Sequence, residues 1–325
     1  TLAFSVDGNA PRAVVHPGSY GEVGEVLRYA TANRLAVIPW GAGTMMHIGN
    51  APARYDIALG LSRLDAVVEH EAADLTATCQ SGITLTALQK RLAATGQMVP
   101  FGPFPGSAAT IGGILATAAY ASTRHAFGTP RDSVIGLRVV TADGKLTRAG
   151  GNVVKNVAGY DLCKLYVGSL GTLGVIVEVT AKLAPLPEAQ RRLALSCVDA
   201  AAACDFARDL ARRGLSLESV ELLNPAAAKA MVGLNSGGAY TLALGRAGTL
   251  AAVERSAADV LSVARLTSAT QLKASDSKRV APVFASLGSN AGEALRCRAA
   301  VLPTQLPSLI EALSSNDSSP AIVAL

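Results

Sequence analysis

Three glycine-rich segments of the chain could bind a ligand through their backbone. The first is Pro39-Trp40-Gly41-Ala42-Gly43-Thr44, which follows an apolar stretch. Glycine lets the backbone approach a ligand closely, and successive N–H groups can form a nest that binds an anion. A nicotinamide dinucleotide fingerprint requires G-x-G-x-x-G, and Met46 stands at its last glycine, so that site fits poorly. A plain turn also fits this loop taken alone.

The second and third segments share the same chemistry. The second reads P-G-S-A-A-T-I-G-G at 105–113, and it fits either a tight helix–sheet crossing or a cofactor lying against N–H groups at a helix start. In the third, glycines recur at 168, 171 and 174, which is typical of a tight loop that enters a strand. Because each segment borders a predicted strand, the three could converge on one extended ligand.

Alternating strands and helices are predicted to position these segments in the first half. Ser19 and Glu22 form the pattern of a capping box, which begins the first helix. Leu85, Leu88 and Leu92 lie on one face of a helix at 84–94. A second, buried helix is expected at 111–119. The predicted strands are 13–16, 35–39, 56–61, 66–70, 75–81, 133–141, 145–149 and 174–183.

Pro185-Leu186-Pro187 is a rigid break and predicts a domain boundary. We therefore expect one domain at 1–185 and a smaller domain at 186–325. The second part shows a β-α-β-β-α-β order, which is typical of a ferredoxin-like α+β domain. Its predicted strands are 192–198, 217–222, 239–245 and 294–302, and its predicted helices are 200–213, 249–264 and 305–314.

Composition limits the classes of function. The 325 residues are 50% hydrophobic and only 16% charged, and no charge occurs between Arg91 and Arg124. This uncharged run exceeds a bilayer span, but its prolines and glycines would leave backbone groups unpaired in lipid, so it predicts a buried loop and no transmembrane segment. The net charge is +5 without a basic run interleaved with aromatics, which argues against nucleic-acid binding.

Cysteine usage argues against a metal centre. The five cysteines form no C-x-x-C pair, so zinc and iron–sulfur sites lack their usual spacing, and no metal is predicted. Free, dispersed thiols suit a reducing compartment. The first ten residues show no signal-peptide pattern, although an upstream signal stays open, so a cytoplasmic location is expected.

Four motifs in order resemble the FAD-binding domain of the vanillyl-alcohol oxidase/p-cresol methylhydroxylase superfamily. They are P-W-G-A-G-T at 39–44, A-T-I-G-G at 109–113, R-D-S-V-I-G-L-R-V-V-T-A-D-G at 131–144 and K-N-V-A-G-Y-D-L-C-K-L-Y-V-G-S-L-G-T-L-G-V-I at 155–176. Within the family, the chain looks most like the FAD-binding subunits of bacterial glycolate oxidases. The resemblance implies a two-subdomain FAD-binding domain with a smaller ferredoxin-like cap, an α+β fold.

The resemblance also implies site residues for a non-covalent FAD, while catalytic residues stay unknown. The pyrophosphate would lie against the first loop, the ribityl and isoalloxazine region against the second segment, and the adenine side against the third. The expected cofactor-binding residues are Pro39, Gly41, Ala42, Gly43, Thr44, Pro105, Ala109, Thr110, Gly112, Gly113, Gly174 and Ile176.

The implied activity is electron transfer from glycolate or another small 2-hydroxy acid through the flavin. The implied partners are a catalytic flavoprotein subunit and an iron–sulfur subunit, which would leave the chain cytoplasmic or peripheral at the inner membrane. Self-sufficient relatives carry a C-terminal histidine cluster, whereas no histidine follows His125 here. A self-sufficient FAD-dependent dehydrogenase and a scaffold subunit without FAD remain the alternatives.

Overall fold

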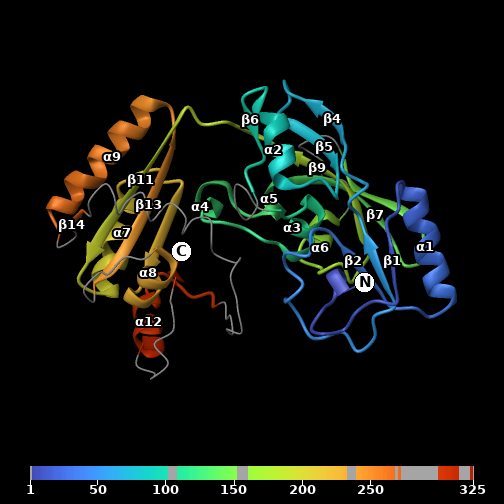
Figure 1. Ribbon diagram of the computed structural model, residues 1–325. Helices are drawn as coiled ribbons and strands as arrows, with labels where there is room; N and C mark the ends of the chain where they lie inside the picture. The colour runs from blue at the N-terminus through green and yellow to red at the C-terminus, as the bar shows by residue number, and fades with distance from the viewer. Residues whose placement is uncertain are drawn as a thin grey trace. The chain divides into compact units, whose positions relative to one another are not determined.

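The computed structural model describes residues 2–101, 108–151, 160–232, 239–267, 270–271, 299–314 and 323–324 (Figure 1). The chain forms two compact units. The first unit holds residues 1–120 and 128–186, and the second unit holds 121–127 and 187–325. The main passage between the units thus lies beside Pro187. The assignment of the short segment 121–127 to the second unit has no counterpart in the sequence-based expectation.

A small parallel sheet forms one layer of the first unit. Its strand order is β1-β3-β2, and Trp40 at the end of β2 pairs with Gly60. The helix α1 begins after Ser19, whose hydroxyl accepts the N–H of Glu22 at 3.2 Å. The carboxylate of Glu22 accepts the N–H of Gly18 and not that of Ser19, so the predicted reciprocal box is shifted by one residue. The elements are β1 (Ala13–Val15), α1 (Tyr20–Ala32), β2 (Val37–Trp40) and β3 (Ile57–Gly60).

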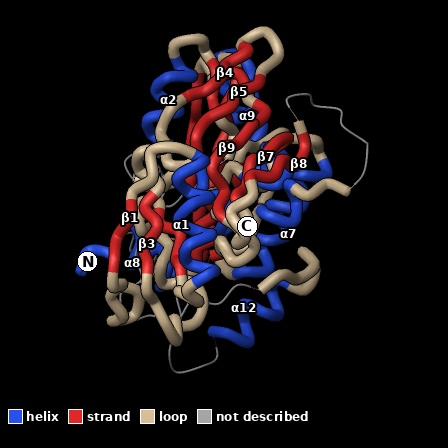
Figure 2. Tube along the Cα trace, turned by 90° about the vertical axis from the view of Figure 1, so that its right-hand side faces the viewer, coloured by secondary structure: helices blue, strands red, loops and turns tan. Residues whose placement is uncertain are grey.

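A five-stranded antiparallel sheet forms the other layer, with strand order β4-β5-β9-β7-β8. Figure 2 shows these strands following one another across the unit. Leu88 and Leu92 of α2 and Ile111 and Leu115 of α3 bury themselves in the core of this unit, as their helical spacing predicts. The elements are β4 (Val67–Glu71), β5 (Thr76–Gln80), α2 (Leu85–Ala93), α3 (Ile111–Thr117), α5 (Pro130–Ser133), β7 (Val134–Val140), β8 (Leu146–Gly150), α6 (Cys163–Tyr166) and β9 (Val175–Lys182).

Short elements complete the first unit and the segment 121–127. The 3-10 helix η1 precedes β1, and β6 pairs with β10 at the end of the unit. The helix α4 belongs to the second unit although its chain neighbours belong to the first. These elements are η1 (Leu2–Phe4), β6 (Gln97–Met98), α4 (Arg124–Phe127) and β10 (Ala184–Pro185).

The second unit has a five-stranded sheet of order β14-β11-β13-β12-β15, in which every neighbouring pair is antiparallel. The helices α7 and α9 cover the apolar face that includes Leu195 and Leu242. The elements are β11 (Ala189–Cys197), α7 (Ala200–Arg212), β12 (Ser219–Leu223), α8 (Pro225–Val232), β13 (Tyr240–Gly248), α9 (Leu250–Arg265), β14 (Thr270–Gln271), α12 (Leu306–Ser314) and β15 (Val323–Ala324).

The ferredoxin-like order is present, but its fourth strand is not the predicted one. The short strand β14 pairs with β11 through Ser196 and Thr270, directly after α9. The predicted strand at 294–302 lies partly outside the described residues, and its described part, 299–302, is not a strand.

Candidate flavin site

The loop after β2 presents unpaired backbone N–H groups. It leaves the sheet where Leu61 donates its N–H to the carbonyl of Trp40 at 2.9 Å. Among the described residues, no hydrogen bond engages the N–H groups of Gly41, Ala42, Gly43 or Thr44. Gly43 has a φ of +72°, a backbone conformation that glycine adopts without strain. The loop therefore offers several donors to an anion without any charged side chain.

Thr110, at the start of α3, lies directly against this loop. A Cβ added to Gly41 would stand 2.2 Å from the Thr110 hydroxyl oxygen, so only glycine fits. The same hydroxyl caps α3 by accepting the N–H of Gly113 at 3.2 Å. The first and second glycine-rich segments thus meet through one glycine and one threonine.

The second segment contributes a close backbone surface and not free donors. The N–H of Ile111 donates to the carbonyl of Ile83 at 2.9 Å, and that of Gly112 donates to Ser81 at 2.8 Å. A Cβ at Gly112 would stand 2.8 Å from the Cβ of Ser81, so this glycine permits the tight crossing of α3 over the chain. Ala109 and Thr110 are buried, which keeps water away from this wall.

The third segment closes on the first two. The N–H groups of Gly168 and Leu170 donate to the carbonyls of Leu115 and Ala116 at 2.9 and 2.7 Å, which ties the loop to the end of α3. Gly171 packs against Pro39, since a Cβ there would meet the proline ring at 3.4 Å. All three segments therefore meet around the carboxyl end of β2.

The remaining predicted binding residues occupy other positions. Gly174 precedes β9 with a φ of +155° and packs against Val139. Ile176 is 5% exposed and belongs to the core of the first unit. Pro105 lies outside the described residues.

Polar residues near these segments mostly have structural roles. Arg131 donates to the carbonyl of Lys164 at 2.7 Å. Asp132 accepts the N–H and the hydroxyl of Thr129, and these hydrogen bonds hold its pKa below the usual value. His47 is exposed after the first loop.

Buried thiols offer little reactivity. Burial raises the pKa of Cys79 to about 12 and that of Cys163 to about 11, so both stay protonated at neutral pH. Cys297 lies outside the described residues. Across the described ranges, no group of three or more His, Cys, Asp or Glu side chains could hold a metal ion.

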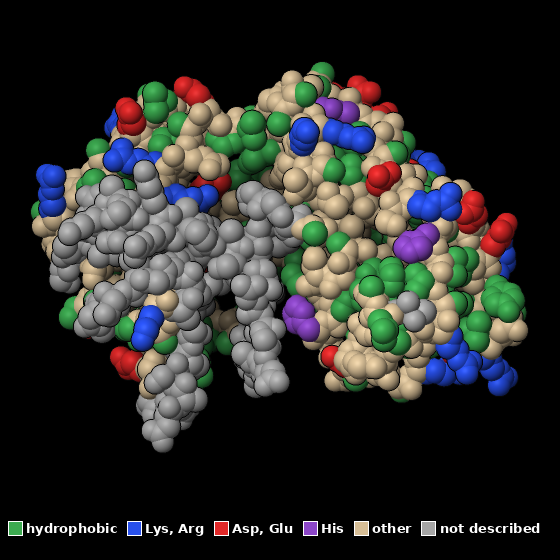
Figure 3. All heavy atoms as spheres, viewed as in Figure 1, with side chains coloured by type: hydrophobic (Ala, Val, Ile, Leu, Met, Phe, Trp, Pro, Cys, Tyr) green, Lys and Arg blue, Asp and Glu red, His purple; other side chains and the backbone are tan. Residues whose placement is uncertain are grey.

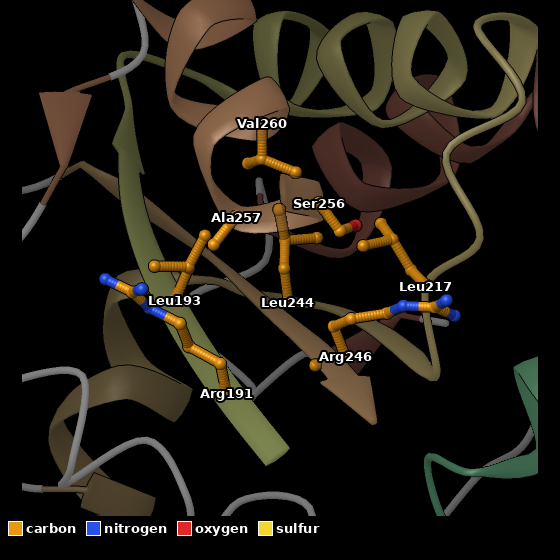
Figure 4. A pocket seen from close by; sticks show the side chains of 9 residues that line it. Arg191, Leu193, Leu217, Leu244, Arg246, Ser256, Ala257 and Val260 are labelled. Atoms are coloured by element: carbon orange, nitrogen blue, oxygen red, sulfur yellow. The ribbon is translucent and has the colours of Figure 1, made fainter. Parts of the chain in front are cut away.

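A small cavity of the second unit lies between its sheet and α9 (Figure 4). Its volume is about 10 Å³, which suffices for one water molecule. Leu193, Leu244 and Val260 line it, while the charged ends of Arg191 and Arg246 point away in Figure 4. It cannot hold a cofactor.

On the face shown in Figure 3, the described basic and acidic side chains are scattered, with both signs interspersed. Within the part of the chain that the structure describes, no helix combines the length and apolar character of a membrane span.

Comparison with known proteins agrees with this geometry. Residues 11–150 match the family model described as an FAD binding domain. This match covers the first loop, α3 and the strand β7, so the first unit carries an FAD-binding domain. The predicted resemblance and the FAD cofactor are confirmed.

The curated relatives are hydroxy acid oxidases and dehydrogenases. The chain is 34% identical over 197 residues to glycolate oxidase subunit GlcD of Bacillus subtilis, covering 59% of this chain and 42% of that protein. It is 34% identical over 170 residues to glycolate oxidase subunit GlcE of Escherichia coli, covering 52% and 48%. It is 37% identical over 191 residues to D-2-hydroxyglutarate dehydrogenase of Xanthomonas citri, covering 58% and 40%. The chain thus spans less than half the length of these relatives.

Solved structures extend the likeness to the fold. Alkyldihydroxyacetonephosphate synthase has a TM-score of 0.70 at 20% identity, covering 85% of this chain and 55% of that one. At this identity the match shows the fold alone. The predicted fold class, an FAD-binding domain with a ferredoxin-like α+β domain, is confirmed.

Proposed function

We propose that the chain is an FAD-binding subunit of a complex that oxidises glycolate or another small 2-hydroxy acid. The observation that carries the proposal is the loop at 41–44, whose N–H groups bond to no residue that the structure describes and which lies against Thr110 in the region that matches the FAD-binding model. Glycolate oxidase subunits and D-2-hydroxy acid dehydrogenases among the relatives support the substrate class.

In this proposal, the chain holds and orients the cofactor. The N–H groups of Gly41 to Thr44 bind the pyrophosphate, whose charge an N–H nest stabilises without a lysine or arginine. Ala109, Thr110, Gly112 and Gly113 form a flat backbone wall for the ribityl and ring system. Gly174 and Ile176 support the adenine side through the strand that follows. When bound, FAD would accept the electrons that the partner flavoprotein subunit takes from the hydroxy acid and would pass them on to the iron–sulfur subunit.

The partners in this proposal are a catalytic flavoprotein subunit and an iron–sulfur subunit. Two of the relatives are named as subunits of glycolate oxidases, which supports an assembly of several chains. A domain role follows: residues 1–185 bind FAD, and residues 186–325 form a cap that contacts partners.

The test is the flavin spectrum of the purified chain. We expect a yellow protein. Under anaerobic conditions, glycolate should not bleach its flavin until the partner subunits are added. Bleaching of the isolated chain would replace the subunit role with a self-sufficient dehydrogenase. A colourless preparation that FAD cannot reconstitute would refute both flavin roles.

A further inference from the structure

Glu221 is a fully buried carboxyl group on β12 of the second unit. Its exposed fraction is 0%, and the buried Ser122 hydroxyl lies near enough to lower its pKa. Within the described part of the chain, neither Glu221 carboxyl oxygen nor the Ser122 hydroxyl has a hydrogen-bond partner. A buried carboxylate without a counter-charge is strongly disfavoured, so the site favours the neutral acid.

Burial dominates the electrostatics of this group. It raises the pKa of Glu221 to about 8, against the smaller lowering by Ser122. Among the residues that the structure describes, no charged side chain contributes to that shift. Glu218 directly precedes its strand. The titratable residues on the described elements packed against β12 are Tyr240 and Arg246 on β13, Arg124 and His125 on α4, and Lys229 on α8, and Arg191 and Arg192 lie one strand further away on β11.

Ser122 belongs to a short segment with an unusual place in the chain. Residues 121–127 are part of the second unit, although the residues on both sides belong to the first. Ala121 and Ser122 are 8% and 2% exposed, and α4 packs on β12. The segment begins four residues after the end of α3 at Thr117, the helix that forms the flavin wall.

We propose that Glu221 is a positioning residue: its uncharged carboxyl group, buried beside Ser122 under segment 121–127, is what allows that segment to pack on the sheet of the second unit. Loss of the proton leaves a buried charge that only water can stabilise, so ionisation favours the state in which the segment has lifted. Any effect on FAD rests on the proposed function, because the segment continues from α3.

Linkage fixes the direction of the pH effect. Lifting the segment exposes Glu221, whose pKa then returns to an ordinary carboxyl value. At any pH between an ordinary carboxyl pKa and about 8, lifting the segment therefore releases one proton from Glu221. The lifted fraction should rise about tenfold per pH unit in this window and level off above it.

Limited trypsin cleavage after Arg124 tests the proposal, because Arg124 is exposed and cleavage follows the lifted fraction. In the purified chain, we expect cleavage at this site, normalised to a peptide substrate, to rise roughly tenfold per unit between about pH 6 and 7.5. In the Glu221→Gln variant it should stay low and flat. Glu218→Gln is the matched control and should keep the wild-type profile at Arg124.

Equal pH profiles for the wild type and Glu221→Gln would overturn the proposal. If Glu221→Gln does not fold, the proposal is tested on the wild type by measuring the hydrogen-exchange protection of amides 121–127 as a function of pH. Protection that falls with pH supports the proposal, and protection that stays constant overturns it. Neither measurement needs bound FAD, so a failure here is distinct from a failure of the flavin proposal. If the proposed function also holds, FAD affinity should fall over the same pH window in the wild type only.

Discussion

Gly41→Ala is the sharpest test of how the glycine-rich segments meet. The added Cβ would stand 2.2 Å from the Thr110 hydroxyl oxygen, whereas ordinary contact begins at 3.4 Å, so about 1.2 Å of movement is required (3.4 − 2.2). The φ of Gly41 lies outside the left-handed region, so the backbone itself accepts alanine. The cost therefore comes from the contact with Thr110.

The magnitude follows from what Thr110 must give up. Rotating its hydroxyl away breaks the cap on the Gly113 N–H, which costs about 1 kcal/mol. An off-rotamer side chain or a displaced loop adds roughly 0.5–1.5 kcal/mol. We therefore expect a loss of about 2 kcal/mol, which lowers Tm by roughly 4–8 °C for a unit of this size. We expect FAD affinity to fall on the order of tenfold, because the same movement displaces the N–H groups at 41–44.

The assay combines FAD titration by flavin fluorescence with thermal unfolding, for Gly41→Ala, Thr110→Ala and the double variant. Thr110→Ala loses the cap but also removes the clash, leaving its Cβ at 3.3 Å from the added atom. The double variant should therefore lose about 1 kcal/mol, well below the sum of the single losses. Additive losses, or an unchanged FAD affinity in Gly41→Ala, would refute the reasoning. Gly21→Ala, on an open face of α1, should leave FAD affinity unchanged.

Three further outcomes are expected. Gly43→Ala forces alanine to a φ of +72° and brings a Cβ within 2.7 Å of the Trp40 ring. It should therefore lower the free energy of unfolding by about 1–2 kcal/mol in thermal unfolding and weaken FAD binding. An unchanged FAD affinity would show that this turn does not contribute to the site. Asp56 accepts the Ala36 N–H at 2.8 Å and the Arg54 guanidinium at 2.7 Å, which hold its pKa low. The ionised Asp56 carboxylate therefore stabilises the folded state above the ordinary carboxyl pKa, and this stabilisation is lost as the pH falls through the lowered pKa. Asp56→Asn should make the free energy of unfolding depend less on pH in the acid range. An acid pH dependence equal to that of the wild type would contradict this. Saturation with FAD at about 100 times Kd should stabilise the chain by about 2.7 kcal/mol, and a Tm that ignores added FAD would contradict binding to the folded state.

The sequence predicts local features of this fold well, because they depend on neighbouring residues. Leu85, Leu88 and Leu92 lie on the buried face of α2, and the alternation of strands and helices follows the predicted order almost throughout. The glycines at 41 and 112 mark close approaches, as their type predicts. The partner in each approach comes from far along the chain, so the sequence alone did not identify it.

Features that depend on distant partners escaped prediction. The membership of 121–127 in the second unit depends on contacts with β12, a hundred residues away, and a four-residue helix carries no periodic signal of its own. The two-residue strand β14 is likewise too short for any alternation to be visible. The free N–H groups of a helix start were expected at 111–113, yet Ser81 and Ile83 occupy two of them, which only tertiary structure decides.

Two residues with left-handed backbone conformations lie where α3 meets the third glycine-rich segment. Ala118 ends α3 at a φ of +49°, and Leu170 adopts +54° in the loop tied to it. Each left-handed residue other than glycine costs about 1–2 kcal/mol. Glycine would relieve that strain at Leu170, yet leucine stands there with 45% of its side chain exposed. Since neither burial nor turn preference favours leucine at this position, its conformation is imposed by the bonds of Gly168 and Leu170 to α3. The geometry that joins the second and third segments is thus maintained against local preference, as expected where several chain segments must close on one ligand.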